Sequence, residues 1–265
     1  MPNTSRRLKN ALRHFFSTRL KDHEIRTGLL NGAKIHTSWH DYPGAILGTT
    51  ERNLLRWLAA NVQPGETWLD VGANCGYTAI ALSRLVGESG RVFAFEPVVS
   101  TAGCLSRTRE LNGLDQMTVV PLALGSLPDI QTLRVPATRG MADYTLEGAS
   151  LSETIYAISL DALWPALGGA DSVVHGIKID VQGMELQVIA GMRELLARWA
   201  PKLIVEFHRG VNRGEALELL ASAGYSMDFE PVERDDAGNA LAGTLANDAS
   251  YVFRGEAACV SSYTR

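Results

Sequence analysis

Apolar runs of strand length alternate with stretches of helical periodicity from Glu66 onward. The first half contains the strand-like runs "TWLDVG", "RVFAFEP" and "MTVVPLAL", separated by helix-like stretches from Cys75 to Leu85 and from Ser100 to Asn112. A strand, a helix and a second strand in succession are the pattern of a parallel βαβ unit. This half of the chain therefore predicts parallel strands with helices packed on the sheet.

The same alternation resumes after a polar stretch from Gly125 to Glu153, which we expect to be a lid or an added hairpin. "VVHGIKID" and "KLIVEFH" predict strands, and Met184 to Trp199 and Glu215 to Ala223 predict helices. The last runs, "YSMDFE" and "SYVFRG", have no helical pattern between them, so they predict an antiparallel hairpin at one sheet edge. The whole pattern predicts an α/β fold with a doubly wound, mostly parallel sheet of about seven strands.

The N-terminal segment has a different pattern. "SRRLKNALRHFFSTRLKDHEIR" carries seven Lys or Arg against two acids, with apolar residues at helical spacing, and it predicts a basic amphipathic helix. Arg13 and Arg19 interrupt the apolar core that a signal peptide needs. We expect this helix to pack on the domain or on the partner subunit of a homodimer, or to touch an anionic membrane surface.

Composition changes this picture little. The chain has 265 residues, 46% of them hydrophobic, a net charge of -4 and no apolar run near the roughly 20 residues that span a bilayer. It therefore predicts one globular domain without a transmembrane segment and without the basic surface of a nucleic-acid-binding protein. Cys75, Cys104 and Cys259 lie far apart, which argues against a disulfide framework or a zinc site and favours a cytoplasmic location.

The first strand runs into a turn and a helix in "LDVGANCGYTAIAL". Gly72 and Gly76 allow close approach of a ligand to the backbone, but the NAD fingerprint also requires glycine at positions 74 and 77, where this chain has Asn74 and Tyr77. Asn tolerates the left-handed conformation that a sharp turn needs. Asp70 before the turn suits a cationic ligand, so the motif disfavours an NAD-dependent oxidoreductase.

Glu96 ends the second strand in "FEP", where a carboxylate can accept hydrogen bonds from both hydroxyls of a ribose. A ribose without a phosphate, and an acid beside a positive centre, describe S-adenosylmethionine. The sequence thus predicts an S-adenosylmethionine site, used either for methyl transfer or for binding alone.

The ordered set of "GTTE", "LDVGANCGYTAIAL", "FEP", "PLALG", "SLDAL", "KIDVQGMELQVIAGM" and "VEFH" resembles the FkbM-type class I methyltransferases. The resemblance implies a seven-stranded, Rossmann-like domain, here over residues 51–265 with residues 1–50 as an N-terminal helix and substrate segment. It also implies O-methylation of a hydroxyl on a sugar, glycolipid or secondary metabolite, with N-methylation as an alternative. The family usually has Glu where this chain has Gln182, which leaves a charge or metal role at that position in doubt.

The resemblance also implies where the donor binds. Asp70, Gly72, Asn74 and Gly76 would lie along the methionine part, Glu96 on the ribose, and Ala123 and Leu124 near the adenine. The neighbouring residues Tyr77, Thr78 and Pro97 complete the predicted donor site.

Polar side chains end two further strands. Lys178 and Asp180 share one face of "HGIKID", and Glu206 and His208 share one face of "VEFH". If these strands are neighbours, the four side chains converge beside the methyl donor. Lys178 and Glu206 can instead form a structural ion pair, because each is costly to bury alone.

His208 titrates near neutrality and can remove the proton of the acceptor hydroxyl. Asp180 can orient His208, accept the proton itself or bind a divalent ion. Asp180, Glu206 and also Glu185 carry oxygen ligands of the kind that Mg²⁺ accepts, but an acid in the first turn of a helix, as at Glu185, is favoured without a metal. Magnesium is therefore an open alternative.

Three residues are candidate acceptor contacts. Tyr42 precedes the first helix of the domain, and Arg139 and Tyr144 lie in the polar stretch. Thr49 or Thr50 can cap that first helix, with Glu51 in its first turn. These positions predict no particular acceptor beyond a small molecule or a glycan.

Overall fold

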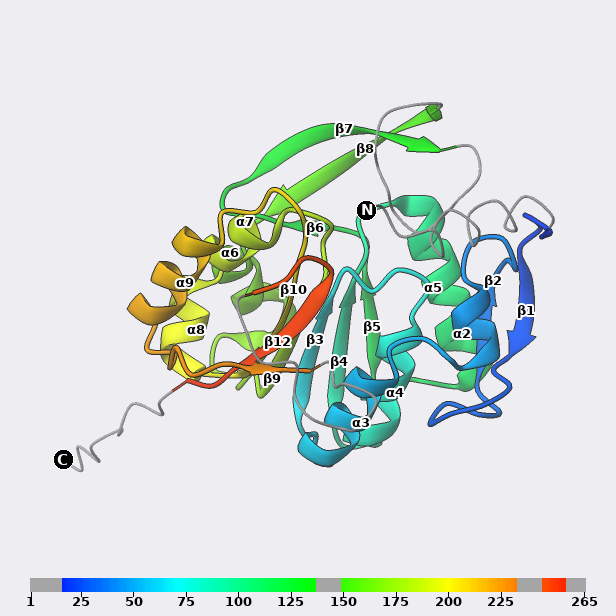
Figure 1. Ribbon diagram of the computed structural model, residues 1–265, viewed down its shortest axis with the longest axis horizontal. Helices are drawn as coiled ribbons and strands as arrows, with labels where there is room; N and C mark the ends of the chain where they lie inside the picture. The colour runs from blue at the N-terminus through cyan, green and yellow to red at the C-terminus, as the bar shows by residue number, and fades with distance from the viewer. Residues whose placement is uncertain (1–15, 137–148, 233–244, 256–265) are drawn as a thin grey trace.

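A computed structural model describes residues 16–136, 149–232 and 245–255. Its centre is a seven-stranded sheet in the order β11-β12-β10-β9-β3-β4-β5 (Figure 1). Strands β10, β9, β3, β4 and β5 are parallel, and β12 joins β10 antiparallel. The strands are β3 (Thr67–Val71), β4 (Arg91–Phe95), β5 (Met117–Val120), β9 (Gly176–Ile179), β10 (Lys202–Phe207), β11 (Glu230–Pro231) and β12 (Ala249–Phe253). The predicted mostly parallel sheet of seven strands, with an antiparallel edge, is confirmed.

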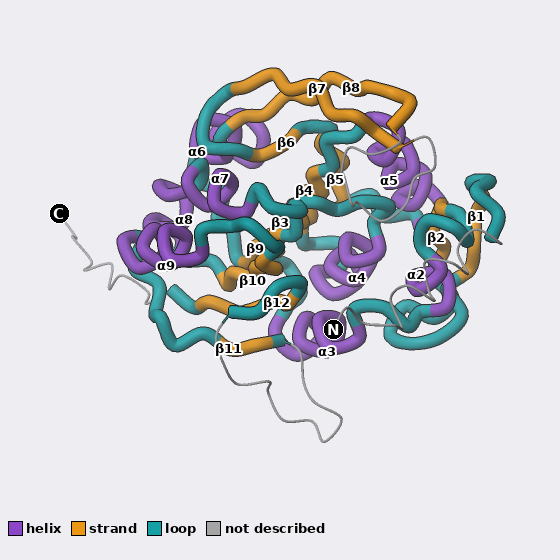
Figure 2. The backbone as a smooth tube through the Cα atoms, turned by 45° about the horizontal axis from the view of Figure 1, so that its top comes forward, coloured by secondary structure: helices purple, strands orange, loops and turns teal. Residues whose placement is uncertain are grey.

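Helices cover both faces of this sheet, and α3 to α5 lie on the opposite side from α6 to α9 (Figures 1 and 2). The first group is α3 (Arg52–Asn61), α4 (Tyr77–Val86) and α5 (Val99–Asn112), preceded by the short α2 (Pro43–Leu47). The second group is α6 (Leu160–Trp164) with the π-helical turn η1 (Pro165–Gly169), α7 (Glu185–Ala190), α8 (Arg193–Trp199) and α9 (Arg213–Ser222). Each face has its own hydrophobic core, so the sheet is doubly wound.

The two faces of β9 carry side chains of different polarity. Ile177 and Ile179 are fully buried in the core under α6 to α9. Lys178 lies between them and points to the other face, where it is 3% exposed. A cation in the interior of a parallel strand is unusual, and it marks the face on which the site is built.

The polar stretch after β5 forms an added hairpin rather than a helix. Strand β7 (Asp129–Pro136) pairs antiparallel with β8 (Ala149–Ile158), and β8 pairs with the two-residue β6 (Ala123–Leu124). The hairpin lies above the main sheet in Figure 1. Residues 137–148 lie outside the described residues.

The predicted helix from Met184 to Trp199 is interrupted, because α7 ends at Ala190 and α8 begins at Arg193. The carboxylate of Asp161 accepts hydrogen bonds from the backbone N–H groups of Glu194 and Leu195, at 3.0 and 2.9 Å. A side chain from another element thus satisfies the free N–H groups at the start of α8. No local pattern in the helical stretch signals this cap.

The N-terminal prediction is wrong where the structure describes it. Lys21–Glu24 is a strand, β1, that pairs antiparallel with β2 (Lys34–Thr37), so the amphipathic helix does not extend to Arg26. Pairing with β2 and burial of the adjacent Ile25 outweigh the helical pattern, and the exposed carboxylate of Asp22 on β1 also forms an ion pair with Arg107 of α5 at 2.8 Å. Residues 1–15 lie outside the described residues. No helix within the described ranges is long and apolar enough to cross a membrane.

Candidate active site

The turn between β3 and α4 is the predicted donor turn. Gly72, Asn74 and Gly76 all have positive φ, at 86°, 49° and 95°, and the left-handed conformation predicted for Asn74 is confirmed. A Cβ atom at Gly72 would lie 1.9 Å from the carbonyl oxygen of Asp180, and one at Gly76 would lie 2.7 Å from the side chain of Leu105. The glycines are therefore required by contacts within the protein, and Gly72 sets the donor turn directly against the end of β9.

Glu96 connects the tip of β4 to the same turn. Its carboxylate accepts hydrogen bonds from the backbone N–H groups of Asn74 and Val98, both at 3.0 Å, and the residue is 6% exposed. Burial raises the pKa of Glu96 to about 7 despite these two hydrogen bonds. Each carboxylate oxygen keeps a lone pair for a further donor, which fits a ribose hydroxyl. The helix α4 begins without a side-chain cap.

The remaining predicted donor residues surround this turn. Tyr77 and Thr78 are buried in the first turn of α4, Pro97 is half-buried after Glu96, and Ala123 and Leu124 form β6. Asp70 is fully buried, and neither of its oxygens has a hydrogen-bond partner among the described residues. The contact of these residues with a donor stays a prediction.

Lys178 lies between the strand that leads into the predicted donor turn and the end of β9. The register places it opposite Asp70 on β3 and opposite Ile204 on β10. Its Nζ atom lies 3.8 Å from a carboxylate oxygen of Asp70 and 3.2 Å from one of Asp180. The proposed ion pair with Glu206 is not formed, because Glu206 lies two residues further along β10, level with Asp180 rather than with Lys178.

The protonation states of Asp70 and Lys178 follow from their burial and from the neighbouring charges. Burial raises the pKa of Asp70 to about 6, and Lys178 limits that rise. Burial would lower the pKa of the Lys178 ammonium, but the carboxylates of Asp180 and Asp70 raise it above its usual value. Lys178 is therefore a fixed positive charge between the two strands.

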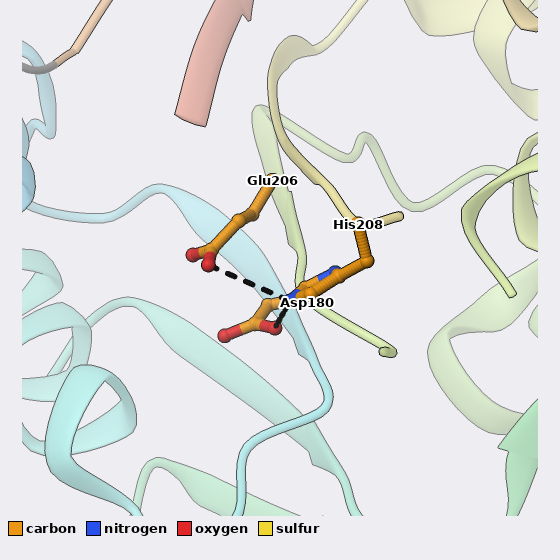
Figure 3. A group of neighbouring side chains, drawn as sticks. All are labelled: Asp180, Glu206 and His208. Carbon is orange, nitrogen blue, oxygen red and sulfur yellow. Dashed lines mark ion pairs between the residues drawn. The ribbon is translucent and has the colours of Figure 1, made fainter. Parts of the chain in front are cut away.

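Asp180, Glu206 and His208 meet beyond the ends of β9 and β10 (Figure 3). The Nε2 atom of His208 lies 3.6 Å from Oδ1 of Asp180 and 3.5 Å from Oε1 of Glu206. Burial and the charge of Asp180 raise the pKa of Glu206 to about 7. Burial would lower the pKa of His208, but its hydrogen bond to Glu185 and the nearby carboxylates raise it. The predicted convergence of these side chains is confirmed.

Sequence reasoning missed the role of Glu185 in positioning His208. Glu185 is in the first turn of α7, as expected, but it is fully buried. Its Oε1 atom accepts a hydrogen bond from Nδ1 of His208 at 2.7 Å and one from the backbone N–H of Gly183 at 3.0 Å. Gln182, exposed and left-handed, donates a hydrogen bond to Asp180 at 3.1 Å, which a glutamate at this position cannot do. The run "DVQGME" is thus a loop that holds both Asp180 and His208.

Glu51 is the second residue whose role was missed. Neither Thr49 nor Thr50 caps α3. The N-cap is Glu51 in a left-handed conformation, without a side-chain capping bond. Its carboxylate instead accepts hydrogen bonds from the hydroxyls of Tyr42 and Thr78, both at 2.7 Å. Glu51 thereby ties the N-terminal segment to the first turn of α4, and the "GTTE" motif is the signal that pointed to this position.

Of the three candidate acceptor contacts, only Tyr42 lies within the described residues. Tyr42 is buried, its ring centre lies 6.0 Å from that of Tyr77, and burial raises the pKa of its hydroxyl well above the usual value. Its role toward an acceptor stays a prediction. Arg139 and Tyr144 lie outside the described residues.

Comparisons with known proteins agree with this geometry. Residues 70–227, more than half of the chain, match the methyltransferase FkbM domain. The chain is 33% identical over 190 residues to the hexuronic acid methyltransferase AglP of Haloferax volcanii, an overlap that covers 70% of this chain and 74% of AglP.

Solved structures show a similar fold. The FkbM methyltransferase of Methylobacillus flagellatus KT is 18% identical with a TM-score of 0.48, and the match covers 80% of this chain but 53%, about half, of that one. The transferase PH0793 of Pyrococcus horikoshii is 12% identical with a TM-score of 0.50, over 90% of this chain and 72% of that one. At 12% identity the likeness to PH0793 supports the fold alone. The family match and the curated relative go further, and the chain belongs to the FkbM family of S-adenosylmethionine-dependent methyltransferases.

Proposed function

We propose that this chain transfers the methyl group of S-adenosylmethionine to a hydroxyl of a sugar or glycosylated molecule. One observation carries the proposal: the donor turn after β3 lies against the backbone of Asp180, whose side chain belongs to the group of Asp180, Glu206 and His208. A donor in the turn and an acceptor at this group would be neighbours. Methyl transfer requires that proximity more than any other feature, because the reaction is a direct displacement.

On the donor side, the methionine part lies along Gly72, Asn74 and Gly76, and the ribose binds Glu96. Ala123 and Leu124 border the adenine. Two observations support this arrangement: Glu96 is hydrogen-bonded to the backbone of the turn, so both move as one unit, and α4 begins without a side-chain cap. S-adenosylmethionine supplies an activated methyl group on a positively charged sulfur when it is bound here.

On the acceptor side, the hydroxyl oxygen lies at the group of Asp180, Glu206 and His208, in line with the S–CH₃ bond. The oxygen forms a bond to the methyl carbon while the carbon–sulfur bond breaks, and the electron pair stays on sulfur. The hydroxyl proton leaves through this group of basic side chains. Lys178 and Glu185 are positioning residues, because Lys178 holds Asp180 and Glu185 holds His208.

The relative AglP from Haloferax volcanii is a hexuronic acid methyltransferase, and a hexuronic acid contains both hydroxyl and carboxylate oxygens. A carboxylate acceptor needs no proton removal. In this chain the side chains of Asp180, Glu206 and His208 can accept a hydrogen bond and a proton from an acceptor hydroxyl. The presence of these proton acceptors favours a hydroxyl.

The test incubates the purified protein with isotopically labelled S-adenosylmethionine and either a hexuronic acid glycoside or the matching neutral hexose glycoside. We expect both to be methylated to ethers, which resist mild alkali. An alkali-labile product from the hexuronic acid alone would show that the acceptor oxygen is a carboxylate. Tight binding of the donor without transfer to any hydroxyl, carboxyl or amine acceptor would overturn the proposal.

A further inference from the structure

We infer that Asp180, Glu206 and His208 bind a divalent transition metal ion, and that this ion holds the acceptor oxygen. The role in the reaction rests on the proposed function, but the binding site itself does not. The three side chains offer one imidazole nitrogen and two carboxylate oxygens, all within 4.8 Å of one another. They come from the ends of β9 and β10, two rigid neighbouring strands.

The separations suit a shared ion better than direct hydrogen bonds. Nε2 of His208 is 3.6 Å from Asp180 and 3.5 Å from Glu206, beyond the usual range for N–H···O contacts. Ligands about 2.1 Å from a tetrahedral ion are about 3.4 Å from one another, as simple geometry requires. The two separations from His208 therefore match those between ligands of one ion, and the two carboxylate oxygens lie within 4.8 Å of each other.

The orientation of His208 is fixed by a second residue. His208 is 8% exposed, its Nδ1 is hydrogen-bonded to the fully buried Glu185, and its Nε2 points at the two carboxylates (Figure 3). A carboxylate behind a histidine commonly orients that histidine toward a metal. Nε2 has no hydrogen-bond partner within the described part of the chain, so a nine-tenths buried ring presents an available nitrogen to the group.

The surrounding charges also call for a cation. Asp70 and Glu185 add to the carboxylates of Asp180 and Glu206, whereas Lys178 is the ammonium that contacts Asp70 and Asp180. Lys178 contacts Oδ2 of Asp180, and Oδ1 faces His208, so Asp180 can bind the ion while remaining paired. A divalent ion would offset two of these negative charges.

The ligand set indicates the kind of ion. Mg²⁺ prefers oxygen ligands alone, whereas imidazole nitrogen suits first-row transition ions such as Zn²⁺, and mixed carboxylate sites accept Mn²⁺. The side chains of Asp180 and Glu206 are 21% and 25% exposed, which leaves one side of the group open for the acceptor. Such an ion would lower the pKa of an acceptor hydroxyl held on that side, so that the hydroxyl would give up its proton more readily.

The test measures ion binding by the full-length protein after chelator treatment and dialysis. Mn²⁺, Zn²⁺ and Mg²⁺ are titrated separately and followed by calorimetry. We expect one Mn²⁺ or Zn²⁺ per chain and much weaker binding of Mg²⁺. His208→Gln and Asp180→Asn should each weaken binding by more than about 100-fold, and Glu185→Gln by about 10- to 100-fold.

Glu88→Gln removes an exposed acid elsewhere on the chain and should leave ion binding unchanged. Circular dichroism establishes that each variant is folded, and having two ligand variants keeps the test valid if one of them fails to fold. A folded protein that binds no ion, or that binds it equally after both ligand substitutions, would overturn the inference. Full methyl transfer by chelated protein would also overturn it while leaving the proposed function intact. Ion binding without transfer to any acceptor would refute the function alone.

Discussion

The proposed donor side and the proposed acceptor side of this site are built in different ways. The donor side is one continuous segment, in which β3, a turn with three positive φ values and α4 follow one another between Thr67 and Val86. The acceptor side consists of single side chains from separate elements: Asp180 after β9, His208 after β10, and Glu185 from α7. A continuous segment specifies its geometry locally, whereas the acceptor group depends on strand register and on distant partners.

Lys178 and Glu51 lie at the boundary between the two sides. Lys178 contacts Asp70 from the donor strand and Asp180 from the acceptor loop. Glu51 binds Thr78 in the first turn of α4 and Tyr42 in the N-terminal segment. Charge and hydrogen bonding therefore connect the two sides, and variants of these residues test whether they act as separate units.

Lys178→Met should have the largest effect on stability, because it leaves the fully buried carboxylate of Asp70 without a cation. We expect the free energy of unfolding to fall by about 3–5 kcal/mol, the usual cost of removing one partner of a buried ion pair. Urea denaturation at neutral pH measures the loss. The double variant Asp70→Asn with Lys178→Met should recover part of it. Lys202→Met removes a partly buried ion pair with Glu66 and a hydrogen bond to the carbonyl of Asn61, and should cost about 1–2 kcal/mol. Equal losses for the two lysines would contradict this account.

Asp180→Asn should separate the two sides in function. Its side chain belongs to the acceptor group, whereas its backbone carbonyl is what contacts the donor turn at Gly72. We expect kcat/KM for the acceptor to fall by about 10²- to 10³-fold, within the range typical for loss of a catalytic acid or base. The dissociation constant for S-adenosylmethionine should remain near that of the unaltered protein. A parallel loss of donor affinity would show that donor and acceptor share Asp180.

The same contrast explains what the sequence could predict. The two-faced sheet, the turn between β3 and α4 and the left-handed Asn74 follow from local periodicity and from residue preferences, and the structure confirms them. The convergence of Asp180 and His208 followed from the expectation that β9 and β10 are neighbours. The partners of Lys178 could not be predicted in this way, because they depend on the register between strands. A shift of two residues along β3 or β10 would place different side chains beside Lys178.

Contacts between residues far apart in the sequence could likewise not be predicted from local sequence patterns. Asp161 caps a helix more than thirty residues away, and Glu51 reaches Thr78 rather than its own helix. The N-terminal segment shows the opposite failure, because its helical pattern is real but Asp22 pairs with Arg107 across the fold and the segment forms β1. Here strand pairing with β2 and burial of Ile25 outweigh the local helical preference.

The variant Glu96→Gln tests the proposed donor site without changing the group of Asp180, Glu206 and His208. The pKa of Glu96 is about 7, above the ordinary value, so the carboxylate form that accepts ribose hydroxyls is lost as the pH falls through 7. We expect Glu96→Gln to weaken donor binding by about 10- to 100-fold at pH 8, as for loss of hydrogen bonds to a charged group. Below pH 7 the unaltered protein should lose about tenfold in affinity per pH unit, and the variant should not share that loss. Calorimetric titration with S-adenosylhomocysteine measures both. Identical pH profiles would exclude Glu96 as the ribose contact.

Tyr42→Phe should have the smallest effect, and it decides on which side Tyr42 acts. Its hydroxyl donates a hydrogen bond to Glu51, so its loss should lower the free energy of unfolding by about 1 kcal/mol. Tyr225→Phe is the matched control, because that buried hydroxyl donates to the carbonyl of Pro201, away from the site, and its loss should cost a similar amount. If Tyr42 acts through Glu51, donor affinity should fall in the Tyr42 variant and not in the control, while KM for the acceptor stays the same. A rise in acceptor KM with unchanged donor affinity would instead make Tyr42 an acceptor contact, and the boundary at Glu51 would then belong to the acceptor side.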